Sequence, residues 1–256
     1  MMNGPSRVRD ALHHILQKKV KTMPRRHSQT FIAVAALAVI SGVALAFAST
    51  EKPTIQDARA TPQTSLKALM DGNARYIKGM ATSENRPENR PALLTTHEPL
   101  AGILRCSDAR VSPEIYFDQP LGALFVTAVA GNIITPENIA SFEYTVGVLG
   151  TKLIVVMGHR RCGAVETAIK MRNNTEELPG SLPMLIDQII VPCTLDADPD
   201  DVAAYEHEAV ICNANKGVTQ LLARSPMLAE AVAKGELKVI AGVQDLKTGE
   251  FTITSP

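Results

Sequence analysis

The sequence predicts an α/β fold, in which a mainly parallel β-sheet is flanked by helices on both faces. Short, almost uninterrupted apolar segments alternate with longer segments of helical periodicity. Strands of a parallel sheet have this apolar character because helices cover both of its faces. The 256 residues, with 45% hydrophobic and 20% charged side chains, suffice for one globular domain plus an N-terminal appendage.

The first 48 residues have the layout of an export signal. A basic segment precedes eighteen uncharged residues, Phe31–Ala48, which end in the small-x-small pattern of a cleavage site. The same segment is just long enough to span a bilayer, so an uncleaved membrane anchor is the alternative. In both cases the basic flank favours the cytoplasmic side. We therefore expect the remainder to be exported, either periplasmic or anchored and facing the periplasm.

The elements that follow are predicted from composition and periodicity. The Pro-containing, polar composition of residues 49–63 predicts a linker. The helical spacing of apolar residues between Leu66 and Ile77 predicts the first helix. Residues 81–99 are rich in Pro, Asn and Thr, which predicts an extended loop. Residues 64–256 are thus the expected folded domain. Four apolar segments predict buried strands, and a fifth, alternating segment predicts an edge strand: Ala101–Arg105, Ala123–Val129, Leu153–Met157, Leu237–Val243 and Phe251–Thr254. Further helices are predicted at Pro136–Leu149, Ala164–Arg172, Asp200–Ala223 and Met227–Lys234.

The charge distribution argues against nucleic acid as a partner. Residues 1–48 carry a net charge of +6 and residues 49–256 a net charge of −6, although the whole chain is neutral. An acidic folded part does not suit a phosphate backbone, and a chain without Trp offers little surface for stacking bases or sugars. We expect contact with a membrane only through the N-terminal segment.

Thiol and imidazole side chains follow two predicted strands at the point where each strand ends. Cys106 comes directly after one strand, and His159 and Cys162 come just after another. Ligand sites of open α/β sheets form beyond the carboxyl ends of the strands, so these residues are expected to meet. A catalytic zinc ion takes three such ligands and keeps a fourth position open. His-x-x-Cys alone is a weak signal that also fits a capped helix with an inert thiol, but Cys106 strengthens it.

Two charged residues follow the first presumed ligand. Asp108 could reach the metal or accept a hydrogen bond from metal-bound water, and Arg110 could pair with Asp108 and hold it off the zinc. The alternative is a surface ion pair that contributes little.

The remaining cysteines, Cys193 and Cys212, lie in or beside helical segments, far apart in sequence. Four cysteines are too few for a disulfide scaffold in a chain of this length. We expect the pair to be buried, small apolar side chains, although an exported protein could oxidise them.

Four segments resemble those of β-class carbonic anhydrases. Residues 106–111 (CSDARV) and 158–164 (GHRRCGA) closely resemble the two signature motifs of that family, and residues 72–76 (GNARY) and 130–132 (AGN) are similar to further family segments. The resemblance extends from about residue 64 to about residue 253. It implies the α/β fold of that family and the reversible hydration of CO2 to bicarbonate and a proton, with zinc-bound hydroxide as the nucleophile.

The resemblance also implies roles for individual residues. One Zn2+ per subunit would be held by Cys106, His159 and Cys162, and an Asp108–Arg110 dyad would either keep the fourth position open or let Asp108 occupy it. The smallest working unit would be a homodimer, and dimers of dimers are common in the family. Gly131 and Gly163 are expected to let the backbone approach the ion and its substrate.

Two positions depart from the family pattern. His97 stands nine residues before Cys106, where a substrate-binding glutamine is usual, and Ala128 stands where an arginine is usual. His97 is expected either to take over the substrate contact or to be an exposed loop residue. These departures keep two alternatives open: hydrolysis of CS2 or COS on the same scaffold, and a catalytically silent zinc-binding dimer.

Overall fold

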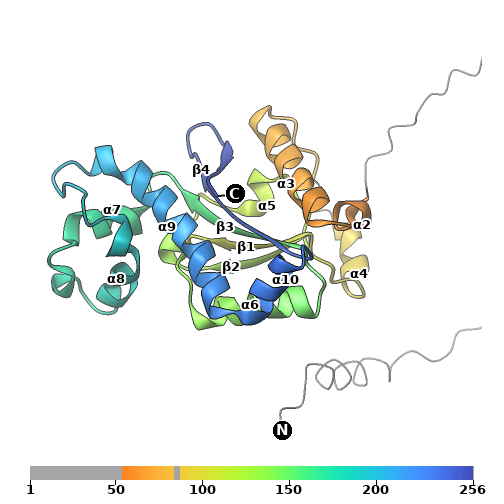
Figure 1. The fold of residues 1–256 in the computed structure, drawn as a ribbon. Coiled ribbons are helices and arrows are strands. Elements are labelled where there is room, and N and C mark those ends of the chain that lie inside the picture. The colour runs from red at the N-terminus through yellow and green to blue at the C-terminus, as the bar shows by residue number, and fades with distance from the viewer. Residues whose placement is uncertain (1–53, 84–86, 256) are drawn as a thin grey trace, which may run out of the picture. The chain divides into compact units, whose positions relative to one another are not determined.

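The computed structural model describes residues 54–83 and 87–255 (Figure 1). The chain divides into two units, Met1–Thr50 and Glu51–Pro256, and all described residues belong to the second. The predicted export signal or anchor therefore lies outside the described residues. Within the part that is described, no helix has both the length and the apolar character needed to cross a membrane.

A five-stranded sheet forms the centre of the unit, in the order β2-β1-β3-β4-β5. Four strands are parallel to their neighbours, and only the edge strand β5 is antiparallel to β4. The strands are β1 (Ala101–Arg105), β2 (Leu124–Ala128), β3 (Leu153–His159), β4 (Lys238–Gln244) and β5 (Phe251–Ile253). Each begins or ends within two residues of its predicted bounds, and the mainly parallel sheet is confirmed.

The order of the strands reverses direction at β1. From β1 the chain moves outward to the edge strand β2, then crosses back over β1 to β3 and continues away to β4. The connections after β1 and β3 therefore run in opposite directions along the sheet, and open α/β sheets bind ligands beyond the carboxyl ends of two such strands.

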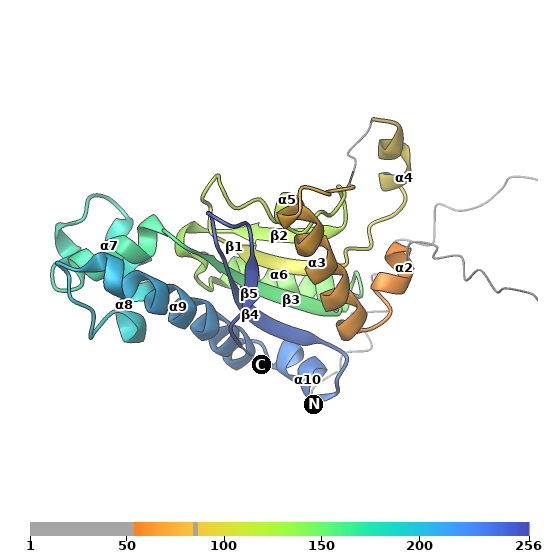
Figure 2. The same cartoon turned by 90° about the horizontal axis from the view of Figure 1, so that it is seen from above.

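Helices cover both faces of the sheet, as predicted (Figures 1 and 2). One face is packed by α3 and α5, and the other by α6, α9 and α10, while α7 and α8 lie beyond the carboxyl end of β3. Their bounds are α3 (Pro62–Ile77), α5 (Pro113–Tyr116), α6 (Pro136–Gly147), α7 (Gly163–Met171), α8 (Leu182–Cys193), α9 (Val202–Arg224) and α10 (Pro226–Ala233).

The folded unit begins earlier than predicted. The described part of the predicted linker contains α2 (Ile55–Ala58), and the Arg59 guanidinium donates hydrogen bonds to the carbonyls of Pro99 and Leu149. The helix α3 starts at Pro62 because Thr61 caps it, its side chain accepting a hydrogen bond from the Thr64 amide. The predicted loop of residues 81–99 is also partly helical, with η2 (Pro87–Asn89) and α4 (Arg90–Leu93).

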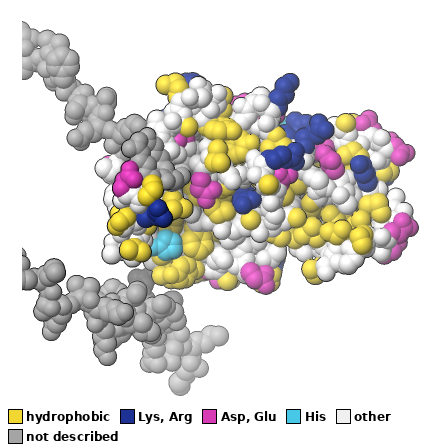
Figure 3. All heavy atoms as spheres, turned by 180° about the vertical axis from the view of Figure 1, so that it is seen from behind, with side chains coloured by type: hydrophobic (Ala, Val, Ile, Leu, Met, Phe, Trp, Pro, Cys, Tyr) yellow, Lys and Arg dark blue, Asp and Glu magenta, His cyan; other side chains and the backbone are white. Residues whose placement is uncertain are grey.

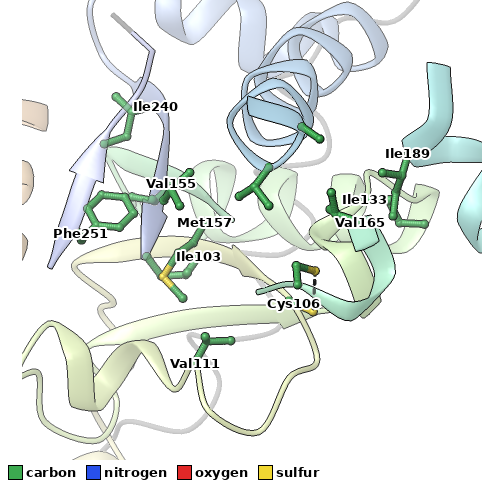
Figure 4. Close-up of a cluster of buried hydrophobic side chains, with 14 of the residues drawn as sticks. Ile103, Cys106, Val111, Ile133, Val155, Met157, Val165, Ile189, Ile240 and Phe251 are labelled. Carbon is green, nitrogen blue, oxygen red and sulfur yellow. Dashed lines mark hydrogen bonds between the residues drawn. The ribbon is translucent and has the colours of Figure 1, made fainter. Parts of the chain in front are cut away.

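Alternate residues of the central strand pack into two apolar layers. Val155 and Met157 of β3 face the layer that includes Leu69 of α3, whereas Ile154 and Val156 face the layer that includes Phe142 of α6. Figure 4 shows the first layer reaching Cys106, with Val111 on one side and Ile133, Val165 and Ile189 on the other. The apolar layer therefore extends to Cys106, the residue that follows β1.

A disulfide joins α8 to α9. Cys193, the last residue of α8, and Cys212 of α9 are bonded, with their Cα atoms 5.4 Å apart. Both side chains are half-buried, so the expectation that they are buried, small apolar side chains is wrong, and the alternative that they are oxidised is the one found. The helix α8 was not predicted either, because its apolar segment between Pro183 and Pro192 fits a strand as well as a helix.

Candidate metal centre

Three buried side chains converge beyond the carboxyl ends of β1 and β3. Cys106 follows β1, His159 ends β3, and Cys162 is the N-cap residue of α7. Their ligand atoms all lie within 4.8 Å of one another. The two Sγ atoms are 4.0 Å apart, and this contact is the dashed line at Cys106 in Figure 4. Thiolates about 2.3 Å from a tetrahedral zinc ion stand about 3.8 Å apart, so the observed spacing fits such an ion.

The imidazole of His159 is oriented as a metal ligand requires. Its Nδ1 lies 2.9 Å from the Arg160 carbonyl oxygen, to which Nδ1–H donates. The other nitrogen, Nε2, then carries a lone pair, and it is buried without a hydrogen-bond partner among the described residues. Metal-bound histidines commonly donate their second N–H in this way. An otherwise unsatisfied buried nitrogen beside two thiols thus fits a metal ion.

The two thiols, Cys106 and Cys162, have pKa values shifted in opposite directions. A hydrogen bond from Cys162 lowers the pKa of Cys106, and the Gly131 amide adds a hydrogen bond to the same sulfur at 3.3 Å. The same contact between the thiols raises the pKa of Cys162. Two thiolates this close are stable together only beside a cation, because a metal ion binds both in their deprotonated form.

A carboxylate lies beside the three ligands but is held by a guanidinium. Arg110 donates from Nε to Oδ1 of Asp108 at 2.9 Å and from Nη2 to Oδ2 at 2.7 Å, and its backbone N–H also bonds Oδ1. These hydrogen bonds hold the pKa of Asp108 well below its usual range. Asp108 Oδ2 lies 3.9 Å from His159 Nε2, so the carboxylate borders the place where an ion would sit.

The two glycines singled out from the sequence differ in their surroundings. Gly131 has φ +71°, its amide donates to Cys106, and an added Cβ would lie 2.5 Å from Ile189 Cδ1. Gly163 begins α7 after Cys162, and an added Cβ would have no atom within 4 Å. The structure therefore gives a steric reason for glycine at position 131 and none at position 163.

The remaining residues named from the sequence lie away from the centre. His97 is exposed, precedes the amino end of β1 and stacks on Phe125, with ring centroids 6.1 Å apart. A strand rises about 3.3 Å per residue, so the two ends of β1 are on the order of 15 Å apart. His97 therefore does not line the centre of its own chain. Ala128 ends β2 and is exposed.

Three side chains or backbone groups around the centre were not identified from the sequence. Glu206 and Asn213, both on α9, are buried and bond the loops that carry the ligands. The Gln244 carbonyl accepts a hydrogen bond from the Arg160 amide, which ties the same loop to β4. The one available signal was that Glu206 and Asn213 are polar and lie two turns apart on one face of a helix.

Comparison with known proteins gives a consistent result. A family model described as Carbonic anhydrase matches residues 101–251. The carbonic anhydrase of Mycolicibacterium smegmatis is 33% identical over 197 residues, which cover 77% of this chain and 95% of that protein.

Solved structures of β-carbonic anhydrases share the fold. The Coccomyxa enzyme in complex with acetazolamide has a TM-score of 0.57 at 24% identity, covering 73% of this chain and 85% of that one. One of two tetrameric enzymes from Sordaria macrospora has a TM-score of 0.56 at 23% identity, covering 75% of this chain and 96% of that one.

Proposed function

Since the chain belongs to the β-class carbonic anhydrase family and is an enzyme of that kind, we propose that it hydrates CO2 reversibly at a single zinc ion held by Cys106, His159 and Cys162. The observation that carries the zinc assignment is the buried, unpartnered Nε2 of His159 beside two thiol sulfurs 4.0 Å apart. Two sulfurs and one nitrogen are a donor set typical of zinc, and three protein ligands leave one position for water.

The chemistry that a bound zinc ion supplies is an activated water, because the ion lowers the pKa of that water from 15.7 toward about 7. The protein fixes the ligands. The Arg160 carbonyl sets the tautomer of His159, and the Gly131 amide stabilises the Cys106 thiolate. The apolar side chains of Val111 and Val165 belong to the same buried cluster as Cys106 and Cys162, and such surroundings suit a neutral, apolar substrate such as CO2.

Asp108 and Arg110 control access to the remaining position. Both oxygens of the carboxylate accept hydrogen bonds from Arg110, so Asp108 is held back from the ligand atoms. A free Asp108 would be close enough to become a fourth ligand, and the position for water would then be lost. The arginine thus keeps the carboxylate as a nearby hydrogen-bond acceptor.

Stopped-flow CO2 hydration across pH, with zinc determined on the same sample, tests the function. We expect one zinc per chain, loss of activity on chelation and recovery with added Zn2+. A folded chain that takes up no zinc would contradict the assignment of the ligands. A zinc-loaded chain without CO2 hydration would favour the silent scaffold, and turnover of CS2 or COS in a parallel assay would favour the hydrolase.

We propose further that the working form is a homodimer or a dimer of dimers. A Sordaria structure similar to this chain is tetrameric. The edge strand β2 adjoins exposed apolar side chains, among them Leu121 and Tyr144, and Figure 3 shows apolar patches on one face of the molecule. Light scattering on the purified protein tests this, and a monomer at assay concentration would contradict it.

We also propose that the folded unit is exported. The layout of residues 31–48 supports this, and so does the Cys193–Cys212 disulfide, since disulfides persist mainly in oxidising compartments. Cell fractionation with N-terminal sequencing tests the proposal and distinguishes a cleaved signal from a retained anchor. Protein found only in the cytoplasm would contradict it.

A further inference from the structure

The helix α9 places two buried polar side chains against the two halves of the metal centre. We propose that Glu206 and Asn213 are positioning residues, each of which fixes one of the two ligand-bearing segments. Glu206 acts on the segment with His159 and Cys162, and Asn213 acts on Cys106. The inference rests on the proposed function, because it assigns these residues to the same zinc site.

Glu206 holds the loop between two of the ligands. Its Oε1 accepts a hydrogen bond from the Arg161 backbone N–H at 2.6 Å, and its Oε2 accepts one from Arg160 Nε at 3.1 Å. Arg161 has φ +58°, a left-handed conformation that costs a non-glycine residue free energy and needs outside support. The Glu206 carboxylate, with only 4% of its side chain exposed, supplies that support from a second element.

The loop that Glu206 fixes also reaches the dyad. The Arg161 carbonyl accepts a hydrogen bond from Arg110 Nη2 at 3.3 Å, and the same Nη2 donates to Asp108. One residue, Arg161, is therefore bonded on its N–H side to Glu206 and on its carbonyl side to Arg110. Glu206 thus sets the spacing of His159 and Cys162 and supports the position of the guanidinium.

Asn213 acts on the other half of the centre through one glycine. Its Nδ2 donates to the Gly131 carbonyl at 2.7 Å, and the Gly131 amide donates to Cys106 Sγ at 3.3 Å. Asn213 is buried, with 4% of its surface exposed. The neighbouring Cys212 carries the disulfide to α8, whose Ile189 packs against Gly131. Gly131 is therefore fixed from two sides, and its N–H points at the sulfur.

The arrangement assigns a positioning function to α9 because both contacts end on backbone groups next to ligands. Residues that orient the ligands of a metal typically change metal affinity by about 10- to 100-fold when they are mutated. Glu206 and Asn213 are seven residues apart, which places them about 10 Å apart along the helix axis, so their effects should be independent.

The test compares metal affinity in variants of the full chain with matched controls. We expect Glu206→Ala and Asn213→Ala each to weaken zinc binding about tenfold or more in competition with a chelator. The losses should multiply in the double variant. Glu206→Gln keeps an acceptor for the Arg161 N–H and should recover much of the affinity. The cobalt-loaded proteins should show altered thiolate-to-cobalt charge-transfer bands for the alanine variants.

Two residues of the same helix serve as controls. Glu208 is an exposed carboxylate, and Asn215 bonds Thr254, which follows the edge strand β5, instead of a group of the metal centre. Glu208→Ala and Asn215→Ala should retain wild-type zinc affinity and cobalt spectra. Asn215→Ala is the stricter control, because it also removes side-chain hydrogen bonds and should lower the stability of the metal-free protein.

The outcomes separate the inference from the proposed function. Zinc affinities and cobalt spectra of Glu206→Ala and Asn213→Ala that match those of the controls would overturn the positioning role, even if both variants are less stable. A variant that does not fold without metal is judged by its cobalt spectrum in the loaded form and by Glu206→Gln. If the wild-type protein itself binds no zinc, the proposed function fails first.

Discussion

The guanidinium of Arg110 bonds both carboxylate oxygens of Asp108, at 2.9 and 2.7 Å, while that carboxylate stands 3.9 Å from the unpartnered Nε2 of His159. In the proposed function, this single ion pair decides whether the carboxylate is a neighbour of the zinc ion or one of its ligands. Bidentate pairs of this kind are stronger and more directional than ordinary ion pairs.

Replacing Arg110 should abolish most of the activity without loss of metal. In Arg110→Ala the carboxylate is released toward the ligands, and we expect kcat/KM for CO2 hydration to fall by about 100-fold or more, equivalent to about 2.7 kcal/mol. Asp108→Asn should cause a similar loss, because the neutral amide cannot form the same pair. Stopped-flow assays and metal analysis of the same samples measure this, and full activity with zinc retained in both variants would refute the role of the dyad.

Removal of one thiol should remove the metal. Cys162→Ala leaves Cys106 and His159 as the only members of the three-ligand group, and two ligands do not hold zinc firmly. After dialysis we expect the variant to retain less than about one tenth of the wild-type zinc content, because metal affinity depends on the number of ligands. Wild-type zinc content in this variant would show that the ion lies elsewhere.

The two glycines near the centre should respond in opposite ways to alanine. Gly131→Ala places a Cβ 2.5 Å from Ile189 at φ +71°, so we expect a loss of about 2 kcal/mol or more in the free energy of unfolding. Zinc affinity should fall with it, since the Gly131 amide bonds Cys106. Gly163→Ala meets open space at the start of a helix and should be neutral in stability and activity. Denaturant unfolding measures both, and a large loss of activity in Gly163→Ala would restore its predicted contact with substrate.

A buried carboxylate remote from the centre gives a pH-dependent contribution to stability. Burial alone would raise the pKa of Asp118, but hydrogen bonds from Ser83, Arg75 and Thr82 outweigh it, and the pKa is lowered. Such a group stabilises the fold above its unfolded pKa of about 3.9 and loses that contribution as the pH falls toward the folded pKa.

We therefore expect Asp118→Asn to lower the free energy of unfolding by about 2 kcal/mol at neutral pH. The difference from wild type should shrink at about pH 3 and below. Asp71→Asn is the matched control, because Asp71 forms an exposed pair with Lys67 that contributes little. Urea unfolding at both pH values measures the effect, and a difference that grows on acidification would show that the sign is wrong.

Reduction of the disulfide should affect stability more than metal binding. Cys193 and Cys212 are 19 residues apart, and closing a loop of that length in the unfolded chain contributes about 3 kcal/mol. The Cys193→Ala, Cys212→Ala double variant should therefore unfold at lower denaturant concentration and retain its zinc. Loss of zinc in this variant would show that the tether between α8 and α9 is needed to form the centre.

The sequence predicts best what depends on local pattern. The strand at Ala101–Arg105 has its predicted bounds because its apolar residues are buried on both faces, and Cys106 follows from where that strand ends. The helix α8 was missed because its apolar residues between two prolines have no clear period. The linker prediction was wrong because Arg59 reaches carbonyls 40 and 90 residues away, which no local pattern reveals.

The surroundings of the ligands were also beyond local pattern. Asp108 and Arg110 are near neighbours in sequence, so their pairing could be foreseen. The contacts of Glu206 and Asn213 span 45 and 82 residues and depend on how α9 crosses the sheet. The left-handed conformation of Arg161 is likewise maintained by tertiary contacts, since its side chain has no intrinsic preference for it.

The separation of the three proposed ligands between β1 and β3 has a consequence for how the protein would acquire a zinc ion. More than fifty residues, including β2 and α6, lie between Cys106 and His159, so an unfolded chain offers no place where the three donors meet. Metal uptake must follow pairing of the two strands. A chain threaded across a membrane unfolded would consequently have to draw its ion from the pool on the far side, and scarcity there would limit the amount of mature enzyme.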